Sequence, residues 1–134
     1  MAVSAAPSAE TIRGIVDAYF RAITALDASA FVGSFAEDGA SHDPEGAPPH
    51  EGPEGLRAFF DGIAALCETC EIKPTSVFVA GSGAAVPWTL TARGKNGKEA
   101  TAEGVDVITV NAAGTIQEVH AYWNPESFIG TLTS

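Results

Sequence analysis

Basic residues are scarce in this sequence. Seven lysines and arginines stand against 17 aspartates and glutamates, which gives a formal net charge of −10. The basic residues are scattered along the chain, and a strongly acidic protein is repelled by nucleic acids and by anionic membrane surfaces. The composition therefore favours a neutral or apolar small molecule as the ligand. We expect neither nucleic acid nor a membrane as a partner.

Long apolar runs and a secretory leader are also lacking. No run approaches the roughly 18 apolar residues of a membrane-spanning helix, and the N-terminus lacks the basic start and apolar stretch of a signal peptide. We therefore expect a cytoplasmic location. A chain of 134 residues is long enough for one compact domain and too short for two. We expect a single domain over residues 1–134, with residues 1–7 as a loose tail.

Cysteine is rare, and its spacing carries a weak signal. Cys67 and Cys70 form a C-x-x-C pair, which in other settings marks a redox motif or half of a zinc site. No second pair follows, and Cys67 completes an apolar helical pattern, so we expect buried structural thiols. The three histidines stand apart without the spacing of metal ligands, which predicts surface or structural roles and no metal. They are His42, His50 and His120.

The first half of the chain has a helical apolar pattern. A continuous stripe at three- and four-residue spacing follows Ser8, which is a suitable N-cap. Residues 40–43 between the later helices form a short extended piece, because a residue that precedes proline is biased away from helix. The predicted helices cover about 8–26, 28–35 and 53–66.

From Glu71 onward the apolar pattern alternates with a period of two. Short loops that contain glycine separate the alternating segments, and Lys95-Asn96-Gly97 is a typical hairpin turn. The predicted strands lie near 72–80, 85–93, 98–110 and 115–123. Strands joined by tight turns are antiparallel, so helices come first and a meander follows. The predicted fold class is α+β, with the N-terminal helices packed against one face of a curved antiparallel sheet.

One carboxylic acid lies on the apolar face of a predicted strand. Between Lys98 and Asn111 the even positions carry small and aliphatic side chains together with Asp106, whereas the odd positions include Glu103. An ionised carboxylate on the buried face would cost several kcal/mol unless it were paired. We therefore expect a raised pKa for Asp106, so that the neutral acid can donate a hydrogen bond. The alternative is a purely structural hydrogen-bond donor.

Two further polar side chains project from predicted apolar surfaces. Tyr19 lies in the middle of the first helix's stripe, and Asp43 closes the extended piece before Pro44. Taken singly, Tyr19 is explained as a packing residue and Asp43 as a turn former. Together with Asp106 they form a set of candidate catalytic residues.

Short segments around these three residues resemble one protein family. The segments include Asp17-Ala18-Tyr19, Phe35-Ala36-Glu37-Asp38, Asp43-Pro44-Glu45-Gly46-Ala47-Pro48-Pro49, Ala58-Phe59-Phe60, Gly114-Thr115-Ile116-Gln117 and Ala121-Tyr122-Trp123. With Tyr19, Asp43 and Asp106 in register, the chain is similar to the ketosteroid isomerases (steroid Δ5-isomerases). These belong to the nuclear transport factor 2-like or SnoaL-like superfamily, and the resemblance implies its cone-shaped α+β fold.

The resemblance implies a reaction without a cofactor. A 3-oxo-Δ5-steroid would be converted through a dienolate into its conjugated Δ4 isomer, with ionised Asp43 moving the proton. Tyr19 and neutral Asp106 would donate hydrogen bonds to the carbonyl oxygen as negative charge gathers there. The resemblance also implies a homodimer.

An aromatic shell and one departure from the family pattern also follow from the resemblance. The implied substrate-binding residues are Phe59, Phe60, Trp88 and Trp123. Trp123 would lie near Asp43 and hold it ionised through the indole N–H. Phe35 and Phe60 stand where some family members carry two further tyrosines, which predicts a less elaborated oxyanion hole.

Two other interpretations stay open, because fold alone does not decide function. One is a SnoaL-like cyclase or epoxide hydrolase that acts on a different apolar substrate. The other is a non-catalytic module that binds a hydrophobic ligand.

Overall fold

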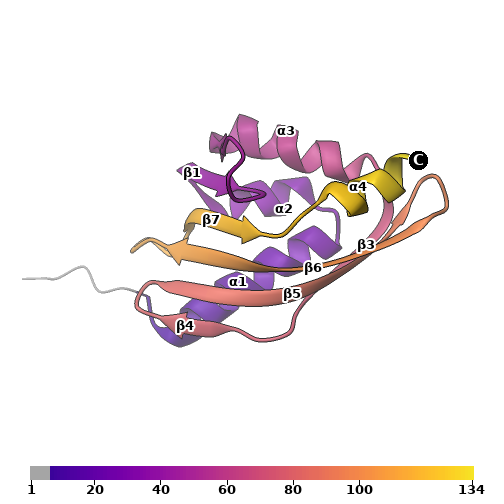
Figure 1. Ribbon diagram of the computed structural model, residues 1–134. Coiled ribbons are helices and arrows are strands. Elements are labelled where there is room, and N and C mark those ends of the chain that lie inside the picture. The colour runs from indigo at the N-terminus through magenta and orange to yellow at the C-terminus, as the bar shows by residue number, and fades with distance from the viewer. Residues whose placement is uncertain (1–6) are drawn as a thin grey trace, which may run out of the picture.

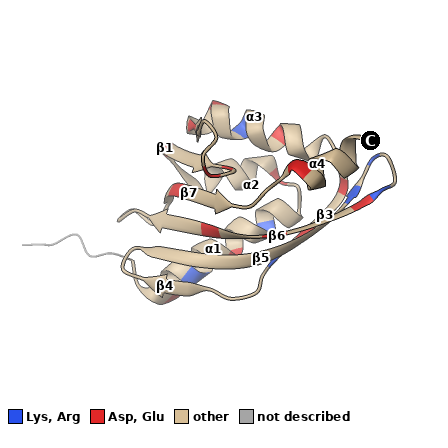
Figure 2. Cartoon of the chain, in the orientation of Figure 1, with Lys and Arg blue, Asp and Glu red and all other residues tan. Residues whose placement is uncertain are grey.

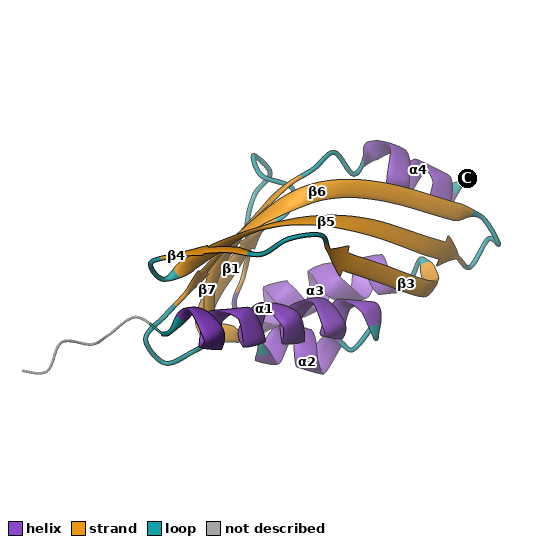
Figure 3. Ribbon diagram, turned by 90° about the horizontal axis from the view of Figure 1, so that it is seen from below, coloured by secondary structure: helices purple, strands orange, loops and turns teal. Residues whose placement is uncertain are grey.

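A curved sheet forms one layer of the molecule, and helices α1, α2 and α3 cover its concave face (Figures 1 and 3). The computed structural model describes residues 7–134, so most of the expected N-terminal tail, residues 1–6, lies outside the described residues. The helices are α1 (Ala9–Thr24), α2 (Ala28–Gly33), α3 (Gly52–Ala64) and α4 (Glu126–Thr133). The strands are β1 (Phe35–His42), β2 (His50–Glu51), β3 (Cys67–Pro74), β4 (Phe78–Ala80), β5 (Gly83–Gly94), β6 (Glu99–Val110) and β7 (Ile116–Tyr122). The predicted α+β class is confirmed.

The sheet is mixed, which corrects the prediction of an antiparallel meander. Its strand order is β2-β1-β7-β6-β5-β3, with β4 paired to β5. The pairs β3–β5, β5–β6 and β6–β7 are antiparallel as expected, but β1 lies parallel to β7. In this region the sequence indicated only a short extended piece at residues 40–43, because the first residues of β1 lack regular alternation. Its pairing with β7 brings the end of β1 beside the last strand.

Helix α1 forms where its apolar stripe predicted a helix. The Ser8 Oγ accepts a hydrogen bond from the backbone N–H of Thr11 at 3.1 Å and caps the first turn. The buried residues of this helix repeat at three- and four-residue spacing and face the sheet. They are Ile12, Val16, Tyr19, Phe20 and Ala22.

Two predictions about the middle of the chain are wrong. Cys67 does not extend the preceding helix, since α3 ends at Ala64 and Cys67 begins β3. The strand predicted near 72–80 is divided into β3 and β4, which are separated after Pro74. Short apolar segments fit a helix end and a strand start equally well, so periodicity could not place this boundary.

The hairpin of β5 and β6 is the longest element pair and follows the prediction closely. Arg93 pairs with Glu99 across the turn, and Gly97 adopts a φ of 81°, which glycine tolerates best. Helix α4 was not predicted, although its buried Phe128 and Leu132 have helical spacing. It packs beside β5 and β6 (Figure 3).

Surface charge agrees with the acidic composition. The lysine and arginine positions, blue on the ribbon, lie scattered over several elements of the described chain and do not gather on one of them (Figure 2). Within residues 7–134, no helix has the length and apolar character needed to cross a membrane.

Candidate active site

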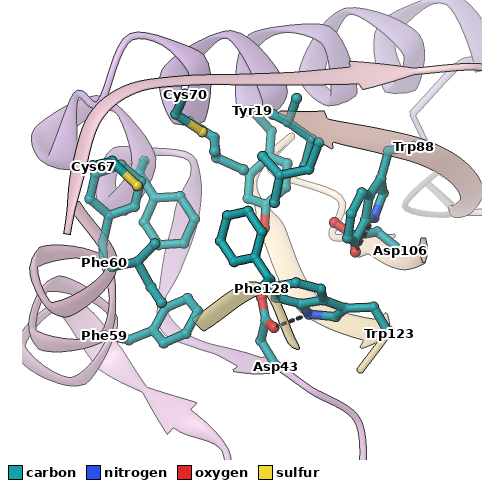
Figure 4. Close-up of a pocket in the computed structure, with 15 residues that line it drawn as sticks. Tyr19, Asp43, Phe59, Phe60, Cys67, Cys70, Trp88, Asp106, Trp123 and Phe128 are labelled. Carbon is teal, nitrogen blue, oxygen red and sulfur yellow. Dashed lines mark hydrogen bonds between the residues drawn. The ribbon is translucent and has the colours of Figure 1, made fainter. Parts of the chain in front are cut away.

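An apolar cavity lies between the helices and the concave face of the sheet. Its walls are aromatic, aliphatic and thiol groups, interrupted by the polar side chains of Tyr19, Asp43 and Asp106. Figure 4 shows the oxygen atoms of these three side chains turned toward the interior of the cavity. The fold thus brings together three candidate residues from α1, the end of β1 and β6.

Asp106 points inward, as the alternation of β6 predicted. Its side chain is only 4% exposed, and one carboxyl oxygen accepts a hydrogen bond from Trp88 Nε1 at 2.9 Å. Burial and, to a lesser extent, the negative charge of Asp43 raise the pKa of Asp106, the Trp88 hydrogen bond lowers it, and together they bring it to about 7. A substantial share of Asp106 is therefore neutral near pH 7 and able to donate a hydrogen bond.

Asp43 follows the last residue of β1 and reaches the cavity beside Trp123. The indole Nε1 of Trp123 donates a hydrogen bond to Asp43 Oδ1 at 2.7 Å, a contact that the resemblance implied. Burial raises the pKa of Asp43 above its usual value, and the Trp123 hydrogen bond and the charge interaction with His50 offset only part of this rise. An indole N–H only donates, so it favours the ionised carboxylate without supplying a proton.

Tyr19 presents a neutral phenol to the cavity. Its ring is 2% exposed and packs against Phe20, Phe31 and Phe35, with ring centroids 5.3, 5.6 and 5.9 Å away. Burial and the charges of Asp106 and Asp43 raise the pKa of Tyr19 well above its usual value of 10. The hydroxyl therefore stays protonated at neutral pH, and Figure 4 shows it turned inward.

The predicted aromatic shell lines the cavity. Phe59, Phe60, Trp88 and Trp123 all contribute to its wall. Phe128 of α4 completes the wall and meets Trp123 edge to face at a centroid distance of 5.7 Å. Sequence reasoning missed Phe128, and its only sequence signal was the four-residue spacing to Leu132.

Gly104 is a second residue that the sequence did not single out. A Cβ atom at this position would lie 2.7 Å from Trp123 Cβ, from Trp88 Cζ2 and from the carbonyl oxygen of Tyr122. Only glycine leaves room for both indoles to cross β6 here. The close approach places the two tryptophans whose N–H groups bind Asp43 and Asp106 side by side, with centroids 5.4 Å apart.

Both cysteines border the same cavity. Cys67 is buried and Cys70 is half-buried, and both are free thiols. Burial raises the pKa of both thiols, and the neighbouring Cys67 helps to bring that of Cys70 to about 12. They are therefore neutral at pH 7 and serve as wall residues, not as nucleophiles.

The histidines do not all stand apart, which corrects the sequence interpretation. His42 and His120 stack with ring centroids 4.2 Å apart, and both lie within reach of Glu118. His42 turns away from the cavity that Asp43 enters, since its partner Glu118 does not line that cavity. His50 stands apart from this pair and stacks on Phe59 at 4.3 Å.

Three solved structures share this fold over most of their length. The epoxide hydrolase/cyclase-like enzyme SalBIII, which has a role in pyran ring formation in the polyether salinomycin, is 24% identical with a TM-score of 0.79, and the match covers 88% of this chain and 94% of SalBIII. The Δ5-3-ketosteroid isomerase from Mycobacterium sp. is 23% identical with a TM-score of 0.77, over 87% of this chain and 95% of the isomerase. RV0760c from Mycobacterium tuberculosis, in complex with estradiol-17β-hemisuccinate, is 23% identical with a TM-score of 0.77, over 87% and 96% of the two chains.

The solved structures show that this chain shares their fold. Membership in a family is shown by a separate match to a family model. The model of the SnoaL-like domain matches residues 16–119, which is most of the chain. Its limits include Tyr19, Asp43 and Asp106 together with most of the sheet. The chain therefore belongs to the SnoaL-like domain family.

Proposed function

We propose that this protein isomerises a 3-oxo-Δ5-steroid, or a similar flat apolar enone precursor, to the conjugated Δ4 product. The observation that carries the proposal is the convergence of Tyr19, Asp43 and Asp106 in one apolar cavity. Tyr19 and Asp106 suit the neutral state that donates a hydrogen bond, and Asp43 suits the ionised state that accepts a proton. Such a division is what a one-base enolisation requires.

Asp43 is the proposed base. It would take a proton from the carbon between the carbonyl and the double bond and return it at the far end of the dienolate. The Trp123 hydrogen bond and His50 favour its ionised form, while burial makes that form more basic than an exposed aspartate. A positioned base of this kind contributes about 10²–10⁴-fold to the rate. Because one group serves both transfers, the reaction needs no cofactor.

Tyr19 and neutral Asp106 are the proposed oxyanion donors. Each hydrogen bond to the developing dienolate oxygen contributes about 10²–10³-fold when the donor is preorganised in a site without water. Burial keeps both groups protonated near pH 7, although Asp106 begins to ionise there. A carboxylic acid held neutral as an oxyanion donor is already the known arrangement of ketosteroid isomerases.

The walls support a flat apolar substrate. The indole nitrogens of Trp88 and Trp123 donate to Asp106 and Asp43, so the rest of each indole offers only carbon surface to a ligand. Phe59, Phe60 and Phe128 add further apolar surface around the same space. A hydroxyl-poor, rigid ring system matches such a lining better than a charged or sugar-like molecule does.

The oxyanion hole has no second phenol. Phe35 packs against Tyr19 where a family tyrosine would stand, and Phe60 lies in the same wall. Tyr122 cannot replace them, because it is 53% exposed and does not line the cavity. We therefore expect Tyr19 to act alone among the tyrosines, and an ultraviolet titration that couples Tyr122 to a bound phenol would contradict this.

The enone absorbance of the product tests the proposal. Purified protein is mixed with 5-androstene-3,17-dione, and the wild type is compared with Asp43→Asn and with Asp61→Asn. Asp61 is an exposed acid that pairs with Arg57 on α3, so its substitution is a matched control. We expect conversion by the wild type and by Asp61→Asn, and a loss of about 10²–10⁴-fold in Asp43→Asn. No gain of absorbance with the wild type would refute the isomerase, and full activity of Asp43→Asn would refute the mechanism.

A SnoaL-like cyclase or epoxide hydrolase is the second candidate. Its support is the fold likeness to SalBIII and a cavity that holds one acid suited to protonating an epoxide oxygen and one carboxylate suited to activating a nucleophile. This chemistry needs no pair of donors on one oxygen. Turnover of an apolar epoxide that survives Tyr19→Phe, without any enone formation, would favour this candidate.

We further propose that the protein is a homodimer. Val107 and Tyr122 lie on the outer faces of β6 and β7 and are 38% and 53% exposed. Exposed apolar side chains on a sheet are a common contact between subunits. Light scattering after gel filtration is expected to give twice the chain mass, and a stable monomer at micromolar concentration would refute the dimer.

A further inference from the structure

A cluster of polar side chains covers the outer face of β1 and β7. His42 is the last residue of β1, and the parallel pairing of the two strands places it opposite His120 of β7. Glu118 lies two residues before His120 on the same strand and therefore on the same face. None of the three lines the apolar cavity, so this cluster is separate from the proposed active site.

Each of the three side chains places one possible ligand atom close to those of the other two. His42 Nε2 lies 3.2 Å and His120 Nε2 lies 3.0 Å from the same oxygen, Glu118 Oε1. The two rings are nearly parallel, with an interplanar angle of 5°, and all three atoms lie within 4.8 Å of one another. Ligand atoms about 2.0–2.2 Å from a tetrahedral zinc ion lie roughly 3.3–3.5 Å apart. Two edges of the triangle are thus already close to the spacing of a metal site.

Glu45 supplies a second, independent observation. Its carboxylate can only accept, so it receives a hydrogen bond from the N–H at Nδ1 of His120. In the neutral ring this leaves the lone pair of His120 Nε2 facing Glu118 Oε1, so either a proton or a metal ion must lie between these two atoms. A carboxylate that holds the far nitrogen of a histidine is the usual outer partner of a metal-bound imidazole.

We propose that His42, Glu118 and His120 bind a divalent zinc ion, with Glu45 as the outer carboxylate that orients His120. Two imidazoles and one carboxylate suit zinc better than magnesium or calcium, which prefer oxygen ligands alone. In the single chain the side chains of His42 and His120 are 24% and 30% exposed, which leaves a fourth position for water. The zinc proposal does not rest on the proposed steroid reaction.

The position of this site links it to the cavity. His42 and Glu45 flank Asp43 and Pro44 in the chain, and the backbone N–H of Glu45 donates to the carbonyl of Ala121 at 2.8 Å. Zinc bound at His42 and His120 would tie both ends of the segment 42–45 to β7. Bound zinc is therefore expected to raise the melting temperature of the protein.

Titration calorimetry with zinc chloride tests the site on the full chain after removal of metals by a chelator. We expect one zinc per chain, and Co²⁺ in its place is expected to give the visible absorption of a four-coordinate site. His42→Ala, His120→Ala and Glu118→Gln are each expected to abolish this binding. Glu45→Gln is expected to weaken it about 10–100-fold, because the outer carboxylate acts through His120.

Two control variants separate the cluster from the other zinc-binding groups of the chain. His50→Ala and Cys70→Ser remove a histidine and a thiol outside the cluster and are expected to keep the one-to-one binding and the rise in melting temperature. The proposal is overturned if the wild type shows no saturable binding, if binding survives both His42→Ala and His120→Ala, or if Cys70→Ser abolishes it.

Discussion

Replacing Trp123 with phenylalanine removes the donor that favours the ionised form of Asp43. Trp123 Nε1 lies 2.7 Å from Asp43 Oδ1, and phenylalanine keeps an aromatic ring there without an N–H. A hydrogen bond to a charged group is worth about 1.5–3 kcal/mol. Since one pKa unit corresponds to about 1.4 kcal/mol, the pKa of Asp43 is expected to rise by about 1–2 units.

The pH dependence of kcat/KM for steroid isomerisation measures this change. The base must be ionised, so the rate rises as pH rises through the pKa of Asp43 and falls as pH rises through the pKa of Asp106. A higher pKa of Asp43 moves the acid limb of the profile in Trp123→Phe to higher pH by about 1–2 units. The two aspartates influence each other, so each limb belongs to the pair and not to one residue alone.

Trp88→Phe is the matched comparison, because it removes the same donor from the other aspartate. The Trp88 hydrogen bond lowers the pKa of Asp106, so its loss keeps Asp106 neutral to higher pH. The alkaline limb is therefore expected to move upward in Trp88→Phe, while the acid limb moves in Trp123→Phe. An acid limb that stays unchanged in Trp123→Phe, in a variant that is still folded, would refute the assigned role of Asp43.

Three further variants test other parts of the site. The pKa of Asp106 is about 7 in the folded state and 3.8 in the ordinary case. Between these pH values the folded state binds the proton more tightly than the unfolded state does, so the free energy of unfolding falls as pH rises. In Asp106→Leu, the free energy of unfolding measured with denaturant is expected to fall by about 4 kcal/mol less over this pH range, and an unchanged fall would contradict the raised pKa. The same variant is expected to lower kcat by about 10²–10³-fold. Tyr19→Phe is expected to lower kcat by about 10²–10³-fold with an unchanged melting temperature, because the ring packing stays; wild-type kcat would exclude Tyr19 as an oxyanion donor. Gly104→Ala is expected to lower the melting temperature and change the tryptophan fluorescence, since its Cβ would lie 2.7 Å from Trp88 Cζ2 and from Trp123 Cβ; wild-type values for both would show that the backbone yields without cost.

Much of the fold follows from two periodicities in the sequence. The stripe of α1 and the alternation of β5 and β6 predicted all three elements and the buried side of each. The parallel contact of β1 with β7 escaped prediction, because it joins segments about 80 residues apart and β1 alternates poorly. Helix α4 escaped because eight residues carry too little periodicity to stand out.

The candidate site likewise has one part that the sequence predicted and another that it could not predict. Asp106 could be predicted from strand alternation alone, and its burial confirms that prediction. The Trp88 hydrogen bond to Asp106, the clearance at Gly104 and the stacking of His42 on His120 depend on side chains from different strands. Each of these contacts is set by strand register, which local patterns do not encode.

The carboxyl ¹³C chemical shifts of Asp43 and Asp106, followed by NMR against pH in the free protein, test the central claim most directly. The claim is that one cavity holds an ionised base and a neutral acid at the same pH. We expect Asp43 to lose its proton first and Asp106 to titrate near its pKa of about 7. A pKa of Asp106 in the ordinary range near 4, or one below that of Asp43, would contradict it.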